Sequence, residues 1–423
     1  MYTRMIKLLI IADDFTGALD TGVQFAMSGV CTRVFTDPAC DFSRVDESVS
    51  VAVVDAETRH LSAACAYDIV YNLTRQAVSL GVSHIFKKTD SGLRGNIGAE
   101  LTAVMTAAGC DQLPFLPAFP QMNRTTRGGV HYIAGTPVSD SVFGIDPFEP
   151  VRHSAVTEII AEQSGAGAHS SPALTGAQDI PQAQGIIVFD AQSEEDLAST
   201  ARILHDAGRL RVMAGCAGLG AVVPALLGLS SGEKPQMPKL DPRLLVLCGS
   251  VNPVTLAQLS EAEHNGFVRL RLRPEQKLTE GYFDTPEGAA YLEAWKKRLA
   301  RYDAVIIDAN DEPDNEATAA YAREHGLSTE NLRVQISRTF GTIMGKLFDC
   351  PDVGTLLITG GDTLLQCMNC VGVYEMEPIG EMASGVVLSR FTLNGCTRFV
   401  ISKSGGFGRS TLLADIRNQI KGQ

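Results

Sequence analysis

The sequence predicts an α/β protein of two domains, each with a mainly parallel sheet flanked by helices, with the active site in the interdomain cleft. Two observations support this prediction. Short apolar runs alternate with amphipathic segments of helical length, and a proline-rich stretch interrupts the pattern near the middle of the chain. Alternation of strands and helices is typical of parallel sheets, because each helix returns the chain to the edge where the next strand begins. The length of 423 residues fits two or three domains of roughly 150 residues each.

The expected strands are short apolar runs that lack the 3.6-residue periodicity of a surface helix. They are Leu8–Ala12, Val51–Val54, His84–Phe86, Ile186–Phe189, Leu244–Leu247, Val305–Ile307, Leu356–Thr359 and Phe399–Ser402. Helix-length amphipathic segments lie between most of them, for example Ala63–Val78, Glu194–Ala207 and Pro286–Leu299. One exception to the parallel pattern is Asn394-Gly395, which lies between two apolar runs and predicts a β-hairpin.

Two stretches predict irregular connections. Residues 164–185 are rich in Gly, Ser, Ala and Pro without periodicity, which predicts a long loop. Residues 231–242 hold three prolines directly before a new apolar run. Because domain boundaries fall in such linkers, we expect one domain over 1–232 and a second over 233–423.

Composition and charge exclude several classes of protein. The net charge of −12 argues against nucleic-acid binding, which needs a basic face. No apolar run reaches the roughly 18 residues of a membrane span, and the N-terminal apolar run is too short for a signal peptide. The ten scattered cysteines are expected to be reduced core residues. We therefore expect a cytoplasmic protein that binds small molecules and neither nucleic acid nor membrane.

The first group of polar residues follows the first expected strand, in "IADDFTGALDTG". Asp13 and Asp14 stand where this strand ends, and Asp20 follows along the next segment. In open α/β sheets ligands bind beyond the carboxyl ends of the strands. One alternative is that the carboxylates only cap a helix. Two adjacent carboxylates exceed what one cap needs, so at least one is expected to bind a polyol or act as a base.

The second group is "KKTDSGLRGNIGAEL", which begins at the end of the strand 84–86. Arg94 could grip a carboxylate through two hydrogen bonds and Lys88 could add a point charge, while Asp90 and Ser91 could read hydroxyls. This mixture suits a small, hydroxylated anion. The alternative is a solvated loop with surface ion pairs, but the glycines at 92, 95 and 98 favour close approach of the backbone.

A third stretch, residues 117–138, carries Arg124, Arg127 and Gly128-Gly129 and could form an anion-binding loop, although a structural role is as well supported. His131 in the same stretch is interpreted as a packing histidine.

Three strand–glycine–helix junctions in the second half predict a nucleotide pocket. Glycines let the backbone approach phosphates, and helix N-termini supply N–H groups and the positive end of a dipole. The junction residues are Ser250, Gly360, Gly361, Asp362, Thr363, Lys403, Gly405 and Gly406. A P-loop, a dinucleotide GxGxxG fingerprint and an HExxH motif are all missing from the sequence.

Taken together, these stretches resemble the four-carbon acid sugar kinases. The matching segments are "IADDFTGALDTG", "KKTDSGLRGN", "PAFPQMNRTTRGGVHYIAGTPV", "ITGGDTLL" and "SKSGGFG", in family order from residue 11 to 408. The resemblance implies an N-terminal domain that binds the sugar acid and a C-terminal domain that binds ATP with Mg²⁺. The chain departs from the family pattern at Gly92, where a hydroxyl residue is usual, and at Asn123, where glycine is usual.

The resemblance also implies roles for individual residues. The substrate contacts would be Asp14, Arg59, Lys88, Thr89, Asp90, Ser91 and Arg94, and the junction residues named above would bind ATP. Asp90 is the first choice of base, Asp14 the second, and Lys88 would lie close to the transferring group. No direct metal ligand is implied: Mg²⁺ would be held by the phosphates, with Asp362 as an indirect ligand. A homodimer is a base-rate expectation only.

The expected reaction is transfer of the ATP γ-phosphate to the terminal (4-) hydroxyl of a four-carbon sugar acid, with D-threonate favoured. The departures at Gly92 and Asn123 leave D-erythronate and 3-oxo-tetronate open as alternative substrates. A non-catalytic sensor of a sugar acid and a nucleotide is the alternative from another class. A dehydrogenase is disfavoured because the dinucleotide fingerprint is missing.

Overall fold

The chain forms two compact units, 1–235 and 236–423. The structure, a computed structural model, describes residues 6–146, 149–230, 235–312 and 314–422. The domain boundary expected between 232 and 233 lies outside these described residues. Each unit has its own hydrophobic core.

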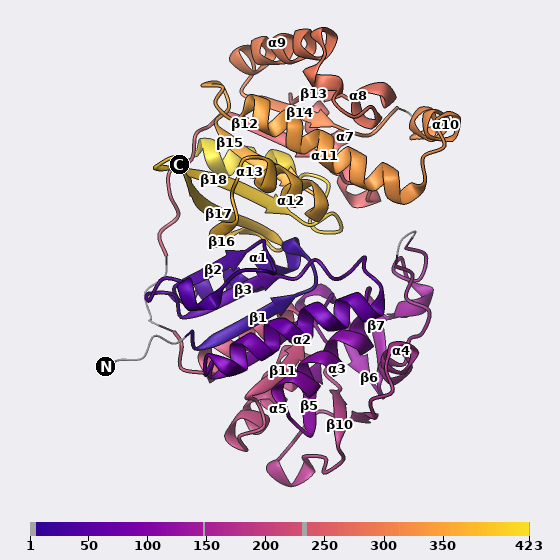
Figure 1. Cartoon of the computed structure of the whole chain (residues 1–423), viewed down its shortest axis with the longest axis vertical. Coiled ribbons are helices and arrows are strands. Elements are labelled where there is room, and N and C mark those ends of the chain that lie inside the picture. The colour runs from indigo at the N-terminus through magenta and orange to yellow at the C-terminus, as the bar shows by residue number, and fades with distance from the viewer. Residues whose placement is uncertain (1–5, 147–148, 231–234, 313, 423) are drawn as a thin grey trace. The chain divides into compact units, whose positions relative to one another are not determined.

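The N-terminal unit contains a parallel sheet in the order β2-β3-β1-β4-β11-β5-β10-β9 (Figure 1). Its strands are β1 (Leu8–Ala12), β2 (Thr32–Phe35), β3 (Val51–Asp55), β4 (His84–Lys88), β5 (Gln112–Leu116), β9 (Ala168–Ser171), β10 (Gly185–Phe189) and β11 (Val212–Gly215). A small antiparallel sheet is formed by β6 (Arg124–Arg127), β7 (Val130–Ile133) and β8 (Thr136–Pro137). The helices are α1 (Phe15–Ala26), α2 (Ala63–Ser79), α3 (Ile97–Ala108), α4 (Val156–Gln163), α5 (Glu194–Asp206) and α6 (Ala217–Leu226).

Strand β1 is apolar throughout because helices cover both faces of this sheet. All of its residues are buried. Successive side chains of a strand point to opposite faces, and Leu9 and Ile11 pack into the core that α2 and α3 share. On the other face, α1 packs against α6. A strand buried on both faces has no polar side of its own, so its first charged residues come where it ends.

The order of the strands places the end of β1 at a switch point of the sheet. The chain runs from β1 to β2 and β3 on one side of β1, then crosses to β4 on the other side. The loops after β1 and β4 therefore diverge to opposite faces and leave a crevice at the carboxyl edge, where ligands of open α/β sheets bind. The polar groups predicted in the sequence follow these strands.

The C-terminal unit repeats this arrangement. Its strands are β12 (Leu244–Cys248), β13 (Val268–Arg271), β14 (Ala304–Asp308), β15 (Thr355–Thr359), β16 (Glu375–Ala383), β17 (Val386–Leu393) and β18 (Cys396–Lys403). Its helices are α7 (Pro253–His264), α8 (Pro274–Leu278), α9 (Pro286–Arg301), α10 (Glu316–Glu324), α11 (Thr329–Leu347), α12 (Gly361–Cys370) and α13 (Leu412–Lys421). The parallel strands have the order β13-β14-β12-β15-β18, which puts a second switch point between β12 and β15.

The strands expected from apolar runs are all present, and the fold class is confirmed. Asn394 and Gly395 form the turn between the antiparallel strands β17 and β18, with φ angles of 51° and 76°. The expectation of a loop over 164–185 is wrong, because residues 168–171 form β9. This edge strand pairs with β10 alone and is held by backbone hydrogen bonds, so its side chains can be polar. It therefore lacks the apolar run by which the other strands were predicted.

The ten cysteines lie in the described part of the chain and are free thiols. Cys216, Cys248 and Cys367 are buried, and Cys40 and Cys110 pack against the N-terminal core, whereas the expectation of core residues is wrong for the exposed Cys65, Cys370 and Cys396. Among the described helices, none combines the length and the apolarity that crossing a membrane requires.

Gly98 of α3 tests the packing between α3 and α4. A Cβ at this position would overlap the carbonyl oxygen of Ile160 and lie 3.0 Å from its carbon, both backbone atoms. Alanine in a helix interior is otherwise favoured over glycine by about 1 kcal/mol. Because the overlap is with backbone, we expect Gly98→Ala to lower the free energy of unfolding by about 1–3 kcal/mol.

Urea denaturation of the full chain measures this effect. Gly165→Ala is the matched control, since a Cβ there meets nothing within 4 Å, and its effect should stay within about 0.5 kcal/mol. Equal stability of Gly98→Ala and wild type would contradict the packing described for α3.

Candidate active site

Charged residues meet at the carboxyl edge of three neighbouring strands in the N-terminal unit. Asp13 and Asp14 follow β1, Arg59 follows β3, and Lys88 is the last residue of β4. Since β3, β1 and β4 are adjacent, these residues are neighbours in space. With Asp90 and Arg94 from the loop after β4, they form what we call the charged cluster.

Arg59 holds the two carboxylates that end β1. Its Nε and Nη2 donate to Oδ2 of Asp13 at 2.8 and 2.7 Å, and its Nη1 donates to Oδ2 of Asp14 at 2.8 Å. Asp14 is also the N-cap of α1, where Oδ1 accepts from the backbone N–H of Gly17 at 3.0 Å. The capping role considered for this stretch is therefore present in Asp14, and it coexists with an ion pair that capping alone does not require.

The two lysines at the end of β4 point to opposite faces of the sheet, as neighbouring strand residues must. Lys87 is fully buried and its Nζ pairs with Glu100 of α3 at 3.0 Å. Lys88 lies on the α1 face, where its Nζ is 3.5 Å from Asp13 and 3.9 Å from Asp14. The room for this ammonium group exists because residue 17 is glycine, since a Cβ there would overlap Nζ of Lys88.

Asp90 fixes the position of Arg94. Its Oδ2 accepts from Nε of Arg94 at 2.9 Å and from the backbone N–H groups of Gly92 and Arg94 at 3.1 and 3.2 Å. Its Oδ1 accepts from Nη2 of Arg94 at 3.1 Å. The remaining Nη1 of Arg94 donates to Asp146 at 3.2 Å. The alternative considered for this segment, a solvated loop with surface ion pairs, does not fit the structure, because Asp90 is buried.

Ser91 connects the charged cluster to the small antiparallel sheet. Its hydroxyl accepts a hydrogen bond from Arg124 of β6, and its carbonyl oxygen lies 3.0 Å from Nε2 of the buried His131. The guanidinium groups of Arg94 and Arg124 both lie over the ring of Phe143, at 5.1 and 5.2 Å from its centre. Arg124 thus belongs to the site.

Two other predicted residues lie differently. The hydroxyl of Thr89 donates to the carbonyl of Gly215 in β11 at 3.3 Å, so Thr89 ties two strands together. Arg127 lies over the ring of Tyr132 at 5.0 Å and is exposed.

The paired carboxylates are held in their charged form. Burial would raise the pKa of Asp14, but Arg59 and Lys88 outweigh it and lower the pKa to about 2. Burial likewise opposes ionisation of Asp90, yet Arg94 and Arg59 hold its pKa well below the usual range. Asp20 of α1 differs, because burial raises its pKa to about 6 despite the charges of Lys88 and Arg124. The same edge of the sheet therefore holds carboxylates of very different basicity.

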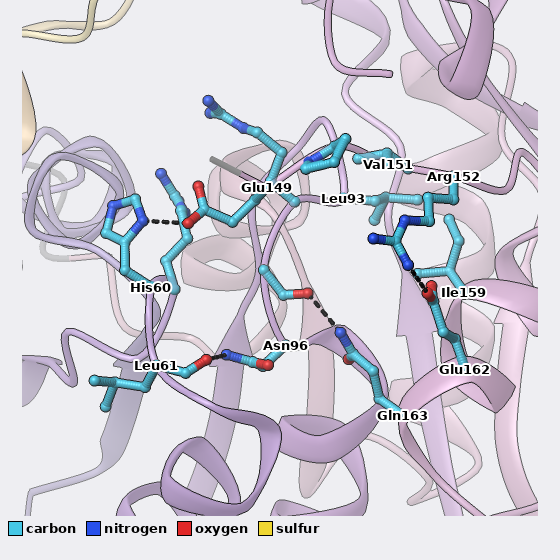
Figure 2. A pocket seen from close by; sticks show the side chains of 14 residues that line it. His60, Leu61, Leu93, Asn96, Glu149, Val151, Arg152, Ile159, Glu162 and Gln163 are labelled. Atoms are coloured by element: carbon cyan, nitrogen blue, oxygen red, sulfur yellow. Dashed lines mark hydrogen bonds and ion pairs between the residues drawn. The ribbon is translucent and has the colours of Figure 1, made fainter. Parts of the chain in front are cut away.

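A pocket of about 290 Å³ adjoins the charged cluster and includes Arg59 and Arg94 in its wall (Figure 2). Asn96 donates to the carbonyl of Leu61 at 2.9 Å, and Gln163 donates to the carbonyl of Gly95 at 2.9 Å. These bonds fix the loops that carry the two arginines. Figure 2 also shows the hydrogen bond between His60 and Glu149 and the ion pair between Arg152 and Glu162 in the wall of the pocket.

In the C-terminal unit, the predicted nucleotide residues gather at the switch point between β12 and β15. A Cβ on Gly360 would lie 3.4 Å from Oγ1 of Thr363 and 3.7 Å from the backbone nitrogen of Ser250. A Cβ on Gly405 would lie 2.8 Å from Oγ of Ser250. Residues that follow β12, β15 and β18 are thus close together beside the N-termini of α7 and α12. These helix N-termini have free backbone N–H groups, which is what an anion needs.

Lys403 and Asp362 have protein partners. Nζ of the buried Lys403 lies 3.1 Å from Oγ1 of Thr255 and 2.9 and 3.2 Å from the carbonyls of Ser404 and Gly405. Burial lowers its pKa to about 8. Asp362 pairs with Arg333 of α11 at 2.5 Å. Within the described ranges, no group of three or more His, Cys, Asp or Glu side chains could hold a metal ion.

Sequence reasoning missed Asp146 and Phe143, which approach the charged cluster only through the folding of their loop, and nothing in their spacing signals it. It expected at least one of Asp13 and Asp14 to bind a ligand or act as a base and then named Asp14 alone, and it gave Asp20 no role. The long side chain of Arg59 can reach a neighbouring strand end. Which carboxylates it meets there, Asp13 and Asp14, could not be predicted without knowing that β3 lies next to β1.

Two family models match the chain along almost its whole length. A sugar-binding N-terminal domain matches residues 8–223, and a nucleotide-binding C-terminal domain matches residues 245–413. Fold and site thus define a protein that combines a sugar-binding unit with a nucleotide-binding unit. The chain belongs to the four-carbon acid sugar kinase family and is a sugar acid kinase.

Relatives support this assignment over their full length. A D-threonate kinase of Salmonella typhimurium is 27% identical, with 97% of each chain covered. A D-erythronate kinase of Heliobacterium modesticaldum is 27% identical, with 90% of each chain covered. A Salmonella typhimurium LT2 protein of solved structure shares the fold with a TM-score of 0.78 at 22% identity, covering 98% of this chain and 99% of that chain.

Asp90 provides a test of the charge balance in the site. Asp90→Asn leaves the buried guanidinium group of Arg59 and the partly buried one of Arg94 short of a counter-charge, so we expect the free energy of unfolding at pH 7 to fall by about 3 kcal/mol. Because the pKa of Asp90 is lower in the folded than in the unfolded chain, its contribution is present at neutral pH and is lost as the pH falls. Urea denaturation at pH 7 and below pH 4 should therefore show a difference that shrinks in acid. An equal difference at both pH values would contradict the pairing.

Proposed function

We propose that the chain transfers the γ-phosphate of ATP to the terminal hydroxyl of a four-carbon sugar acid, with D-threonate as the favoured substrate. The observation that carries the proposal is the charged cluster at the switch point of the N-terminal sheet, with Lys88 beside Asp13 and Asp14. Support for the substrate comes from the relatives: those from Salmonella typhimurium and Bordetella bronchiseptica are D-threonate kinases. D-Erythronate and 3-oxo-tetronate, named for other relatives, are the alternatives.

The charged cluster supplies groups of both signs to a hydroxylated anion. Carboxylates accept hydrogen bonds from hydroxyl groups, and cations attract the carboxylate of a sugar acid. Arg59 and Arg94 each have carboxylate partners at 2.7–3.2 Å, whereas Nζ of Lys88 lies 3.5 and 3.9 Å from the carboxylates of Asp13 and Asp14. Lys88 can therefore turn toward an incoming anion at the lowest cost, while Arg59 and Asp90 hold their partners in place.

The nucleotide-binding role is proposed for the junctions of the C-terminal unit. Backbone N–H groups near Ser250, Gly360–Thr363 and Gly405–Gly406 would receive the phosphates of ATP. Lys403 would act through the loop whose carbonyls it binds, because its N–H groups already face acceptors. Magnesium would come with the phosphates and supply charge neutralisation, and Asp362 would contact it at most through water, since Arg333 already holds this carboxylate. Positioning and neutralisation of charge account for most of the catalysis of phosphoryl transfer.

A coupled assay of ADP formation over isomers of threonate, erythronate and 3-oxo-tetronate tests the proposal. We expect ADP release that requires MgATP and a tetronate, with the highest kcat/KM for D-threonate. A sensor that binds both ligands without reaction would show binding by calorimetry and no ADP above the blank. That result would reject the kinase proposal.

Gly17→Ala tests the role of Lys88 without removing a charge. The added Cβ would overlap Nζ of Lys88 and Oδ1 of Asp14, which are ends of side chains and not backbone, so the fold should persist while the ammonium group and its partner carboxylate move. We expect kcat/KM for the sugar acid to fall at least tenfold, which corresponds to about 1.4 kcal/mol of transition-state stabilisation. The melting temperature should stay within a few degrees of wild type. Unchanged kcat/KM with a folded variant would remove Lys88 from the proposed site.

A further inference from the structure

Three of the carboxylates near the charged cluster are occupied by strong donors. Asp13 accepts two hydrogen bonds from Arg59, and Asp14 accepts from Arg59, Thr16 and the backbone of Gly17. Both oxygens of Asp90 accept from Arg94. Hydrogen bonds and positive charges that favour the ionised form make a carboxylate a weak base. These residues are therefore suited to holding cations and hydroxyls, and poorly suited to accepting a proton.

Asp20 lies on the same face of α1 as Gly17, the residue that contacts Lys88. Residues three apart on a helix are neighbours, and Asp20 follows Gly17, the residue against which Nζ of Lys88 lies. Its charge interacts with Lys88 of β4, Arg124 of β6, Asp14 before α1 and Cys216 before α6. These charged and titratable groups come from each of the elements β4, β6, α1 and α6.

The carboxylate of Asp20 has no hydrogen-bond donor among the described residues. The bond recorded at this residue is from Gln24 to its backbone carbonyl, at 3.4 Å. Asp20 is partly exposed, whereas Asp13 and Asp90 are buried. A carboxylate that interacts with the charges of two cations of the proposed site, without accepting a hydrogen bond from either, has its lone pairs available to a ligand.

On the basis of the proposed kinase function, we infer that Asp20 accepts the proton of the sugar-acid hydroxyl that attacks ATP. The hydroxyl oxygen forms a bond to the γ-phosphorus, and the bond from that phosphorus to the β–γ bridging oxygen breaks. The electron pair of the broken bond leaves with ADP, and the proton passes to the carboxylate of Asp20 and then to solvent. Asp20 thus replaces Asp90, the first choice from the sequence, and Asp14, the second.

The basicity of Asp20 agrees with this role. Burial raises its pKa to about 6, while the pKa of Asp14 is about 2. A general base works best when its pKa lies near the operating pH. At pH 7 Asp20 is ionised and more basic than either rival.

The test compares Asp20→Asn with Asp90→Asn and with Asp68→Asn, an exposed carboxylate of α2 that serves as control. We expect Asp20→Asn to lower kcat for D-threonate by a factor of about 10²–10⁴, with the KM for ATP within about twofold. Wild-type kcat should fall as the pH drops below about 6, and this acidic limb should be missing in Asp20→Asn. Asp20→Glu, which keeps a displaced base, should retain the limb at reduced kcat.

The melting temperature of Asp20→Asn shows whether a loss of activity comes from the missing base or from an unfolded variant. The pKa of Asp20 is raised on folding, so the folded chain loses stability relative to the unfolded chain as the pH rises from about 4 to about 6. Asp20→Asn should therefore melt at a higher temperature than wild type at pH 7.5 and at a similar temperature at pH 4. Turnover within threefold of wild type, or an unchanged acidic limb, would overturn the inference. Failure of folded wild type to form ADP with any tetronate would instead overturn the proposed function.

Discussion

The guanidinium group of Arg59 is the interaction on which the N-terminal site depends. It pairs with two adjacent carboxylates, Asp13 and Asp14, at the end of a strand that is buried on both faces. Burial alone opposes the charge on Asp14, and the cations reverse that effect. Without such a partner, charges this close would be expelled to solvent or neutralised. The site is therefore organised before any ligand arrives, as preorganised charge stabilisation requires.

Pairing inside the site also decides which groups remain available. Arg94 is fixed by Asp90 and Asp146, and Arg59 by Asp13 and Asp14, so neither guanidinium can move far. Nζ of Lys88 lies farther from its carboxylates, at 3.5 and 3.9 Å, which agrees with its proposed role of meeting the ligand. Lys88, Asp90 and Arg94 belong to one sequence motif but differ in role: Asp90 and Arg94 hold each other in place, and Lys88 is the residue proposed to meet a ligand.

The fold could be predicted from the sequence largely because its central strands are buried. Runs such as Leu8–Ala12 and Leu244–Cys248 are apolar on both faces, which separates them from amphipathic helices. The edge strand β9 was missed because it pairs on one side only and carries polar side chains. The residues at the strand ends were found because they interrupt apolar runs with charge. The ion pairs between these residues could not be predicted, because they depend on the order of the strands and on loops such as the one that carries Phe143.

The two units use the same switch-point topology with different surfaces, and the difference follows from ligand chemistry. A hydroxylated acid presents donors and acceptors in many directions, which charged side chains such as Asp14 and Lys88 can match individually. A phosphate presents a compact, symmetric charge, which backbone N–H groups at helix N-termini match without side chains. On the proposed function, glycines at 360 and 405 would let phosphates approach the backbone, whereas in the N-terminal unit Gly17 leaves room for the ammonium group of Lys88 and the capping carboxylate of Asp14. A common sheet order therefore supports two kinds of recognition, because only the residues after each strand decide what binds there.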